Sequence, residues 1–503
     1  MASTKTNVAA SFAGQIWTAV LGIVFVPVYL RYIGVESYGL IGIFMSLQAF
    51  MSLLDFGISP TINREMARLS ISPENGQEMH DLRRTLLIPN WLSAIAILII
   101  LCALSPIIAN YWVTPKSLSV ATVTRAFLLI SFSTAFQFLS GFNAGGLIGL
   151  QKQVLINGIN ICFGTVRYVG GWVVLVLVSP TIEALLGWQF FVVVLQTIAT
   201  SIAFKRSLFP APAKGRFRKD LLLRVWRFAT GMTGMGVIAL VLMQSDKIIL
   251  SRMLNLEDFG YYSLAVTLSS LAISMIVTPI VSVVYPKLST LVALGNDANL
   301  IRYYHRACQL LAGLLIPTVT VLAFFSYQVI LLWTRNSEIA EHSHVLLTLV
   351  VIGGGMNALL MLPYHMQLAH GWTKLAIYLG LAAICTVTPL MIVGVHYYGV
   401  FGGVLAWIVY NAVYGAVMIM LMHRRILVQE KWHWLVRDVL PPTVVSVVFN
   451  IIVYKVLEGS LSSLTMVSQI VVIGLVSVTT LAIGCVSLGS LRELVKNSVL
   501  GYE

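Results

Sequence analysis

Apolar runs of about 20 residues recur along this chain, and they restrict its fold more than any other feature. Each run is long enough to cross roughly 30 Å of hydrocarbon as a helix. Only 10% of the 503 residues are charged and 58% are hydrophobic, whereas soluble globular chains are about one quarter charged. A transmembrane β-barrel would show alternating apolar and polar residues, which these runs lack. The sequence therefore predicts an all-α polytopic membrane protein.

Fourteen candidate spans fit this pattern. They lie near 8–30, 37–60, 86–109, 121–145, 154–178, 182–204, 225–250, 260–285, 307–333, 345–368, 374–395, 400–422, 439–457 and 465–487. The first run is too long for a signal-peptide core and has no small-residue cleavage site after it. We therefore interpret it as the first membrane helix.

The basic residues predict how these spans are oriented. With the N-terminus in the cytoplasm, 24 of the 32 Lys and Arg residues fall in cytoplasmic segments, five on the opposite face and three within spans. Such an excess is typical of cytoplasmic loops, and it places both termini in the cytoplasm. The net charge of +13 is then mostly a consequence of topology. Because the basic residues are spread over many short loops, they do not indicate a nucleic-acid partner.

One short loop occurs twice in the sequence. "LRYIGVESYG" begins at Leu30 and "SRMLNLEDFG" begins at Ser251, an offset of 221 residues. The aligned positions are Arg31 with Arg252, Ile33 with Leu254, Val35 with Leu256, Glu36 with Glu257, Tyr38 with Phe259 and Gly39 with Gly260. Hairpin loops favour Gly and charged residues in any case, and an Arg at a span end can snorkel. We favour duplication, because two independent loops rarely match at so many positions.

The two copies predict a parallel internal repeat, since an even number of spans separates them and both lie on the outer face. We expect a six-helix lobe over 1–204, a basic cytoplasmic linker over 205–220, and a second six-helix lobe over 221–422. Residues 423–503 would add two further helices and a cytoplasmic tail. Two such lobes around a central cavity are typical of transporters, although the architecture names no substrate.

Ionisable residues within membrane spans are costly, so each is a functional candidate. Arg167 lies near the middle of its span with no acidic neighbour in sequence, and we predict that it contacts an anion. Lys247 is a second candidate cation, although Asp246 beside it suggests a local charge pair. Arg125 is a third, but it lies only a few residues inside its span, which favours snorkelling.

Three groups are candidates for ion coupling: Asp55, Asp246 and His365. Asp55 would carry a proton, pair with Arg64 or cap local structure. His365 would titrate or serve only as a hydrogen-bonded packing residue. Polar side chains at helical spacing predict wet helix faces or interhelical hydrogen bonds. They are Asn7, Ser11 and Gln15 in the first span, Gln48 and Ser52 in the second, and Asn357 in the tenth.

Several functional classes have no signature in this sequence. It shows no phosphate loop, nucleotide fingerprint or catalytic triad, and the five cysteines have no metal-binding or redox spacing. We therefore expect a transporter with no cofactor, no resident metal and no enzymatic activity. An ATP-driven pump is not expected from this chain alone.

Two segments resemble a known family. "SFAGQIWTAVLGIVFVPVYLRYIGVESYGLIGIFMSLQAFMSLLDFGISPTINREMAR" and "DKIILSRMLNLEDFGYYSLA" are similar to the openings of the two halves of polysaccharide-repeat flippases, above all O-antigen flippases. These belong to the multidrug/oligosaccharidyl-lipid/polysaccharide exporter superfamily. The resemblance covers about 7–422, is specific at the two hairpins, and is compositional elsewhere.

The resemblance implies translocation of undecaprenyl-pyrophosphate-linked oligosaccharide across the bacterial cytoplasmic membrane, coupled to an ion. It implies a cavity lined by basic residues, where Arg167 and Lys247 fit a pyrophosphate. Besides membrane lipids, it suggests a polysaccharide polymerase and a chain-length regulator as partners.

Related functions remain as alternatives. The region "SFAGQIWTAVLG" lacks both the Arg–Asp pair usual in lipid II flippases and the acidic residue common in multidrug exporters. A polysaccharide polymerase or ligase is the alternative from another class, but those enzymes typically carry a large outer loop. The longest outer loop expected here, Asn110 to Val120, is short.

Overall fold

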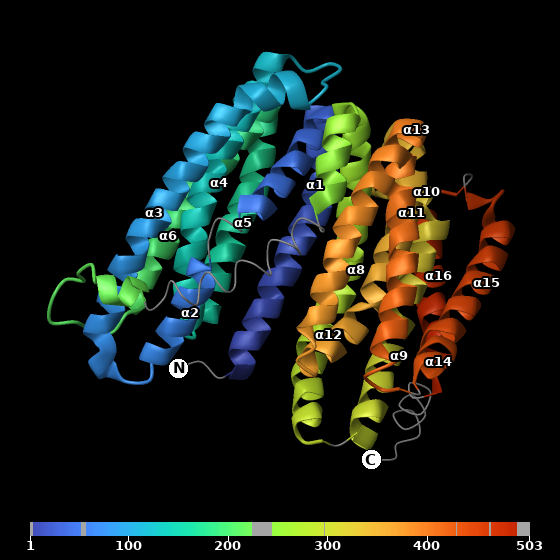
Figure 1. The fold of residues 1–503 in the computed structure, drawn as a ribbon. Helices are drawn as coiled ribbons and strands as arrows, with labels where there is room; N and C mark the ends of the chain where they lie inside the picture. Colours follow the sequence, from blue (N-terminus) through green and yellow to red (C-terminus); the bar gives the residue numbers. More distant parts are fainter. Residues whose placement is uncertain are drawn as a thin grey trace. The chain divides into compact units, whose positions relative to one another are not determined.

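The computed structural model describes residues 4–51, 57–223, 244–295, 297–428, 430–461 and 464–489. Within these ranges the regular elements are helices, apart from one isolated bridge between Thr114 and Asn255 (Figure 1). The all-α fold predicted from the apolar runs is therefore confirmed. The chain divides into two compact units, Met1–Gly260 and Tyr261–Glu503.

The first unit is built on a bundle in which α4 packs between α3 and α6, and α5 packs against α1 and α6 (Figure 1). Aromatic and aliphatic side chains fill one end of it, where Phe142 and Phe204 are fully buried and meet edge to face. The helices are α1 Thr4–Met51, α2 Ile58–Leu69, η2 Pro73–Asn75, α3 Gly76–Ile107, η3 Ile108–Trp112, α4 Val120–Gly149, α5 Gln153–Leu177 and α6 Ile182–Ser207.

In the second unit, α9 is a central helix that contacts α11, α15 and α16. The two helices predicted beyond the second lobe therefore pack on α9. From residue 256 onward the helices in the described ranges are α8 Leu256–Ala293, α9 Asp297–Phe324, α10 Ser326–Thr334, α11 Ser337–Leu359, α12 Met361–Ala369, α13 Thr373–Met422, α14 Lys431–His433, η4 Trp434–Val439, α15 Leu440–Leu457 and α16 Met466–Val486.

Glycines join successive predicted spans in two places. Gly34 within α1 has φ 76° and Gly399 within α13 has φ 57°, so each long helix consists of two segments joined at a residue with non-helical backbone. A side chain would strain either position, because a positive φ favours glycine. The first segment of α1 corresponds to the predicted span 8–30, and the segments of α13 correspond to 374–395 and 400–422. The second segment of α1 covers the span predicted over 37–60 only as far as Met51, because residues 52–56 lie outside the described residues and α2 begins at Ile58.

Eleven helices in the described ranges are long and apolar enough to cross a membrane. Two of them contain the kinks just described, and most of the span predicted over 225–250 lies outside the described residues. The number fourteen therefore stays a prediction. Two predicted spans are also broken into pairs of helices, 307–333 at Phe325 and 345–368 at Leu360.

The amphipathic helix α2 and the early start of α3 were not predicted. Residues 58–69 bury Ile62, Met66 and Leu69 and expose polar side chains on the other side. Such a helix is too short and too polar to be found by a search for membrane-length apolar runs.

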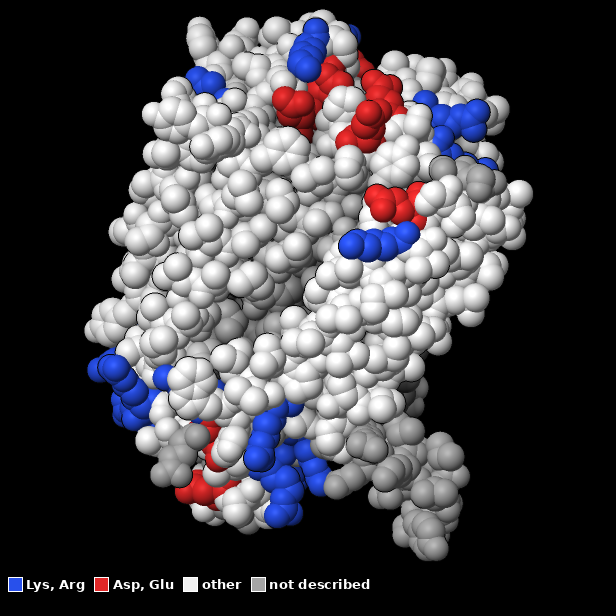
Figure 2. Space-filling view, turned by 90° about the vertical axis from the view of Figure 1, so that its right-hand side faces the viewer, with Lys and Arg blue, Asp and Glu red and all other residues white. Residues whose placement is uncertain are grey.

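The charged side chains follow a pattern expected of a membrane protein. On the face shown in Figure 2, most Lys, Arg, Asp and Glu side chains lie near the top and the bottom of the view. One acidic and one basic side chain lie together on the right between these groups, and the rest of the band is free of charge. A hydrocarbon layer requires such a band, because an unpaired charge within it costs several kcal/mol (about 2.5–3.5 at a helix centre on insertion scales).

Candidate functional site

Arg167 of α5 is held by a chain of amide side chains from two helices. Its Nη2 donates to Gln196 Oε1 of α6 at 2.7 Å, and Gln196 Nε2 donates to Asn160 Oδ1 of α5 at 3.0 Å. Arg167 Nε is buried and has no hydrogen-bond partner among the described residues. The described acidic residues form no ion pair with it either. The neutral amides position the guanidinium but leave its charge uncompensated.

Aromatic side chains lie next to this arginine, between α1 and α5. Tyr29 stacks on Tyr168 with ring centroids 6.2 Å apart, and its hydroxyl donates to the Tyr168 carbonyl oxygen at 2.8 Å. Phe25 lies 5.8 Å from the Tyr168 ring. Gly171 admits this packing, since a Cβ there would approach the Tyr29 hydroxyl to 2.7 Å. Aromatic side chains therefore pack α1 closely against α5 beside Arg167.

The other two candidate cations have local partners. Arg125 Nη2 lies 3.4 Å from Glu183 Oε1, and the Arg125 side chain is 64% exposed, which agrees with a position near the end of its span. Lys247 Nζ donates to Gln244 Oε1 at 3.2 Å. Arg125 therefore has a carboxylate partner, whereas the hydrogen bonds of Arg167 and Lys247 are to neutral amides.

The structure describes two of the three ion-coupling candidates. Asp55 lies outside the described residues. Asp246 is half-buried one residue before Lys247. His365 Nδ1 lies 2.7 Å from the Met361 carbonyl oxygen, and its ring packs edge to face against Tyr285 and Tyr364. Its contacts are those of a packing residue.

Several of the predicted polar side chains bridge helices. Asn7 Nδ2 donates to the Gln151 carbonyl oxygen at 3.4 Å, Ser11 Oγ accepts from Asn157 Nδ2 at 3.3 Å, and Asn357 Nδ2 donates to Asn411 Oδ1 at 2.9 Å. Gln48 hydrogen-bonds to Gln137. Gln15 is exposed, and Ser52 lies outside the described residues. In the first unit these bridges fix α1 on α5 and α4, so most of the stripe serves helix packing.

The two copies of the repeated loop bind the same segment between η3 and α4. Glu36 is buried and accepts from the Lys116 backbone N–H at 2.5 Å and from the Ser117 backbone N–H at 3.0 Å, and it also bonds to the Ser117 hydroxyl. Glu257 pairs with the Lys116 ammonium at 2.9 Å. The two equivalent glutamates thus both bind Lys116: Glu36 binds the backbone N–H of Lys116, and Glu257 binds its ammonium group.

The segment that follows α6 lies along α3 rather than hanging free. Gln77, Asp81 and Thr85 are spaced four residues apart on one face of α3, and they accept from the backbone N–H groups of Ala213, Arg216 and Arg218 at 3.1, 2.8 and 2.9 Å. This ladder fixes the backbone of the predicted basic linker and leaves its Lys and Arg side chains exposed.

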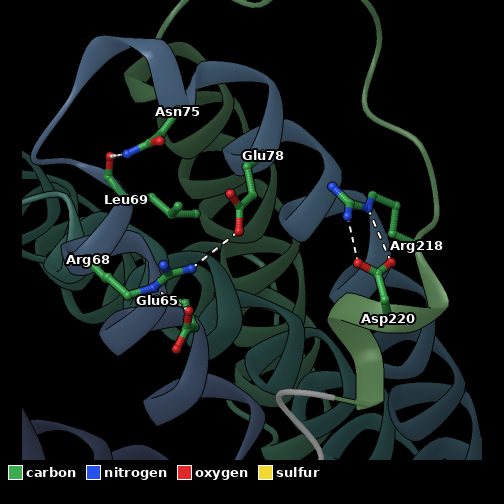
Figure 3. Close-up of polar contacts among 7 residues, drawn as sticks. All are labelled: Glu65, Arg68, Leu69, Asn75, Glu78, Arg218 and Asp220. Carbon is green, nitrogen blue, oxygen red and sulfur yellow. Dashed lines mark hydrogen bonds and ion pairs between the residues drawn. The ribbon is translucent and has the colours of Figure 1, made fainter.

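Charged pairs lie within the docked linker and between α2 and α3, as Figure 3 shows. Arg218 pairs with Asp220 at 2.6 Å, and Arg68 of α2 bridges Glu65 at 2.9 Å and Glu78 of α3 at 3.3 Å. The hydrogen bonds and charges of these two glutamates, Glu65 foremost, raise the pKa of Arg68 despite the opposing effect of desolvation. The described residues contain no group of three His, Cys, Asp or Glu side chains that would hold a metal ion.

Residues 4–292 match the family described as "Polysaccharide biosynthesis protein". The chain belongs to this family. A protein of similar sequence is the Shigella flexneri protein named "Putative O-antigen transporter", which is 22% identical over 383 residues, 75% of this chain and 87% of that protein. The family resemblance carried by the two hairpins is thereby confirmed.

Solved structures of transporters share the fold of this polysaccharide biosynthesis protein. The lipid II flippase MurJ in an inward closed conformation is 15% identical, with a TM-score of 0.71 over 98% of this chain and 100% of that chain. An inward-facing multidrug resistance transporter of the MATE family, in the MOP superfamily, is 16% identical, with a TM-score of 0.64 over 83% and 96% of the two chains. At sequence identities this low, the structural similarity shows a shared fold and says nothing about a shared substrate.

Two features of the site were not predicted from sequence. Gln196 and Asn160, which orient Arg167, are polar residues inside apolar runs. Asn160 lies seven residues before Arg167, which is a helical spacing, but Gln196 lies 29 residues after it on another helix and had no local signal. The burial of Glu36 had none, because its partners Lys116 and Ser117 lie about 80 residues away along the chain.

Proposed function

We propose that this protein is a flippase that moves an undecaprenyl-pyrophosphate-linked oligosaccharide, the repeat unit of O-antigen or a similar surface polysaccharide, across the bacterial cytoplasmic membrane. Its family and the Shigella flexneri relative support this function. The observation that carries the proposal is the uncompensated Arg167 guanidinium on α5.

The chemistry of Arg167 fits a phosphate-bearing substrate. A cation inside a membrane span without a carboxylate partner is unfavourable unless a ligand or water supplies the opposite charge. Its hydrogen bond to Gln196 orients the guanidinium plane, and its Nε–H has no hydrogen-bond partner among the described residues. A planar guanidinium binds phosphate oxygens bidentately, whereas an ammonium acts as a point charge.

The transport cycle follows from the lobed architecture. We propose lobes over 1–204 and 221–422, joined by the basic linker 205–220 and followed by the additional helices of 423–503, with both termini in the cytoplasm. Alternating exposure of a central cavity would carry the pyrophosphate from the inner to the outer leaflet. Ion coupling drives this cycle, and Asp55, Asp246 and His365 remain its candidate groups. A polymerase and a chain-length regulator would receive the product.

Complementation of a flippase-null strain tests the proposal. Arg167→Ala should reach the membrane at wild-type abundance but fail to restore surface polysaccharide. Arg125→Ala is the matched control, because it removes an exposed cation that already pairs with Glu183. Full complementation by Arg167→Ala would show that Arg167 does not contact the substrate, and Lys247 would become the next candidate.

Two further measurements separate the alternatives. Lipid-linked units should accumulate on the inner leaflet of a strain without this protein, whereas loss of a polymerase or ligase would leave them on the outer leaflet. The wild-type protein should also fail to support growth when the native lipid II flippase is depleted. Rescue there would assign lipid II as its substrate.

A further inference from the structure

In the second unit, His305 of α9 lies between two carboxylates. Its Nδ1 is 2.5 Å from Asp438 Oδ2 of η4, and its Nε2 is 3.2 Å from Glu430 Oε2, which immediately precedes α14. The side chains are 16%, 0% and 18% exposed for His305, Asp438 and Glu430. Glu430 and Asp438 lie 125 and 133 positions after His305, so only the fold brings them to it.

This geometry requires one more proton than a neutral imidazole and two ionised carboxylates carry together. A neutral imidazole has one N–H donor and one acceptor nitrogen, while an ionised carboxylate can only accept. Both ring nitrogens of His305 face carboxylate oxygens. Either the imidazole carries both protons or one carboxyl group is protonated, because otherwise two acceptors would face each other across one of the two contacts.

The surroundings favour placing that proton on His305. Asp438 is completely buried and also accepts from Gln309 Nε2 at 2.9 Å, but no described Lys or Arg forms an ion pair with it. A buried carboxylate without a cation is costly, so the imidazolium is its natural partner. Glu430 in turn lies 2.6 Å from His433 Nδ1, which adds a second imidazole to the network.

Other titratable groups around the cluster are few. On α9 the buried Tyr304 hydroxyl and Cys308 thiol lie near Asp438, and from the end of α13 the buried His423 ring interacts with His305 and Glu430. Lys431 is close enough to act on His423. None of these groups replaces the imidazolium as the hydrogen-bonded counter-charge of Asp438.

We propose that His305, Asp438 and Glu430 form a proton-binding site in which the bound proton holds η4 and the residues before α14 against α9. With the proton present, both imidazole nitrogens donate and the two carboxylates are satisfied. When it leaves, one contact becomes acceptor against acceptor, and the join between α9 and η4 weakens. The site thus makes the seating of the C-terminal helices α15 and α16 depend on protonation. This inference does not depend on what the chain transports.

Nitrogen-15 NMR of the full-length protein in lipid nanodiscs tests whether the proton is bound. The chain has nine histidines, and the resonance that disappears in His305→Gln identifies His305. We expect that resonance to be imidazolium at pH 7.5, one unit above the ordinary histidine pKa of about 6.5, and neutral in Asp438→Asn. His370→Gln, which removes a histidine bonded only to its own helix, is the control. A neutral His305 in the wild type at pH 7.5 would overturn the proposal.

Hydrogen–deuterium exchange tests whether the proton joins the elements, and it needs no substitution at His305. After correction for intrinsic rates, we expect residues 431–439 to lose protection by about tenfold or more between pH 7 and pH 9.5, the effect of losing a hydrogen bond to a charged group. Asp438→Asn should show the same loss already at pH 7, while peptides of α4 stay protected. Protection of 431–439 that is constant across this pH range would rule out the proposed join.

Discussion

Gly39 and Gly260 lie against each other's loop in a reciprocal arrangement. A Cβ on Gly39 would collide with the Leu256 carbonyl oxygen, and a Cβ on Gly260 would collide with the Val35 carbonyl oxygen. Gly260 is the sequence equivalent of Gly39, and Leu256 is the equivalent of Val35, at the same offset of 221 residues. A contact in which each copy presents the same surface to the other is characteristic of two-fold symmetry. It supports the parallel repeat and explains why both copies end in glycine.

Replacing either glycine should weaken the protein by the same mechanism. Gly39→Val and Gly260→Val should each lower the thermal transition of the purified protein and its abundance in membranes, because backbone atoms cannot move aside as a flexible side chain can. Gly158→Val is the control, since open space surrounds that position on α5. Differential scanning fluorimetry in detergent measures the effect. Equal stability of all three variants would contradict the close approach of the two loops.

The equivalent glutamates should differ in their contribution to stability. Glu36 is buried and accepts two backbone N–H bonds, so Glu36→Gln places an amide where only an acceptor fits and should cost about 1.5–3 kcal/mol. Glu257 is 35% exposed and Lys116 is 54% exposed, so water screens their pair and Glu257→Gln should cost less. Thermal unfolding in low and high salt distinguishes them. A larger loss for Glu257→Gln would reverse this assignment.

Cysteine labelling tests the orientation of the repeat. Arg31 and Arg252 are equivalent in the two loops and both are exposed, as is Lys214 in the docked linker. In a cysteine-free background, Arg31→Cys and Arg252→Cys should react with a membrane-impermeant maleimide from outside intact cells. Lys214→Cys should react only after the membrane is opened. Labelling of the two arginine positions from opposite sides would end the parallel-repeat model.

Glu430 should account for part of the stability that the protein loses as the pH falls. Partial burial acts to raise its pKa, but the hydrogen bond from His433 and the charge of His305 prevail and lower it. A carboxylate with a lowered pKa stabilises the fold above its unfolded pKa of about 4.5, and this stabilisation disappears as the pH falls through the lower folded value. The melting-temperature difference between wild type and Glu430→Gln should therefore be constant from pH 5.5 to 7 and shrink below about pH 4.5. A difference that grows toward acid would give the shift the opposite sign.

The sequence predicted the membrane helices well because their signal is local. Length and hydrophobicity within one run located α4, α5, α6 and α16 to within a few residues. It missed α2, whose amphipathic pattern is shorter than a span. At the sites, a charge in an apolar run singled out Arg167, but nothing local indicated that Gln196, 29 residues later, orients it. His305 and Asp438, which are 133 residues apart, meet only through tertiary packing.

Gln196→Glu separates a structural role of Arg167 from an anion-binding role. The substitution keeps the shape of the side chain but places a carboxylate against Arg167 Nη2, where an amide oxygen now lies at 2.7 Å. The new pair compensates the guanidinium charge, so membrane abundance and melting temperature should be unchanged or higher. Its charge also competes with a phosphate for the same donors, so transport should fall by about ten- to a hundredfold, the loss expected for a hydrogen bond to a charged group of about 1.5–3 kcal/mol.

Gln196→Met, which cannot neutralise Arg167, should retain more transport than Gln196→Glu despite being less stable. Complementation assays paired with melting curves decide the matter, and the proposal fails if transport simply follows stability across the two variants.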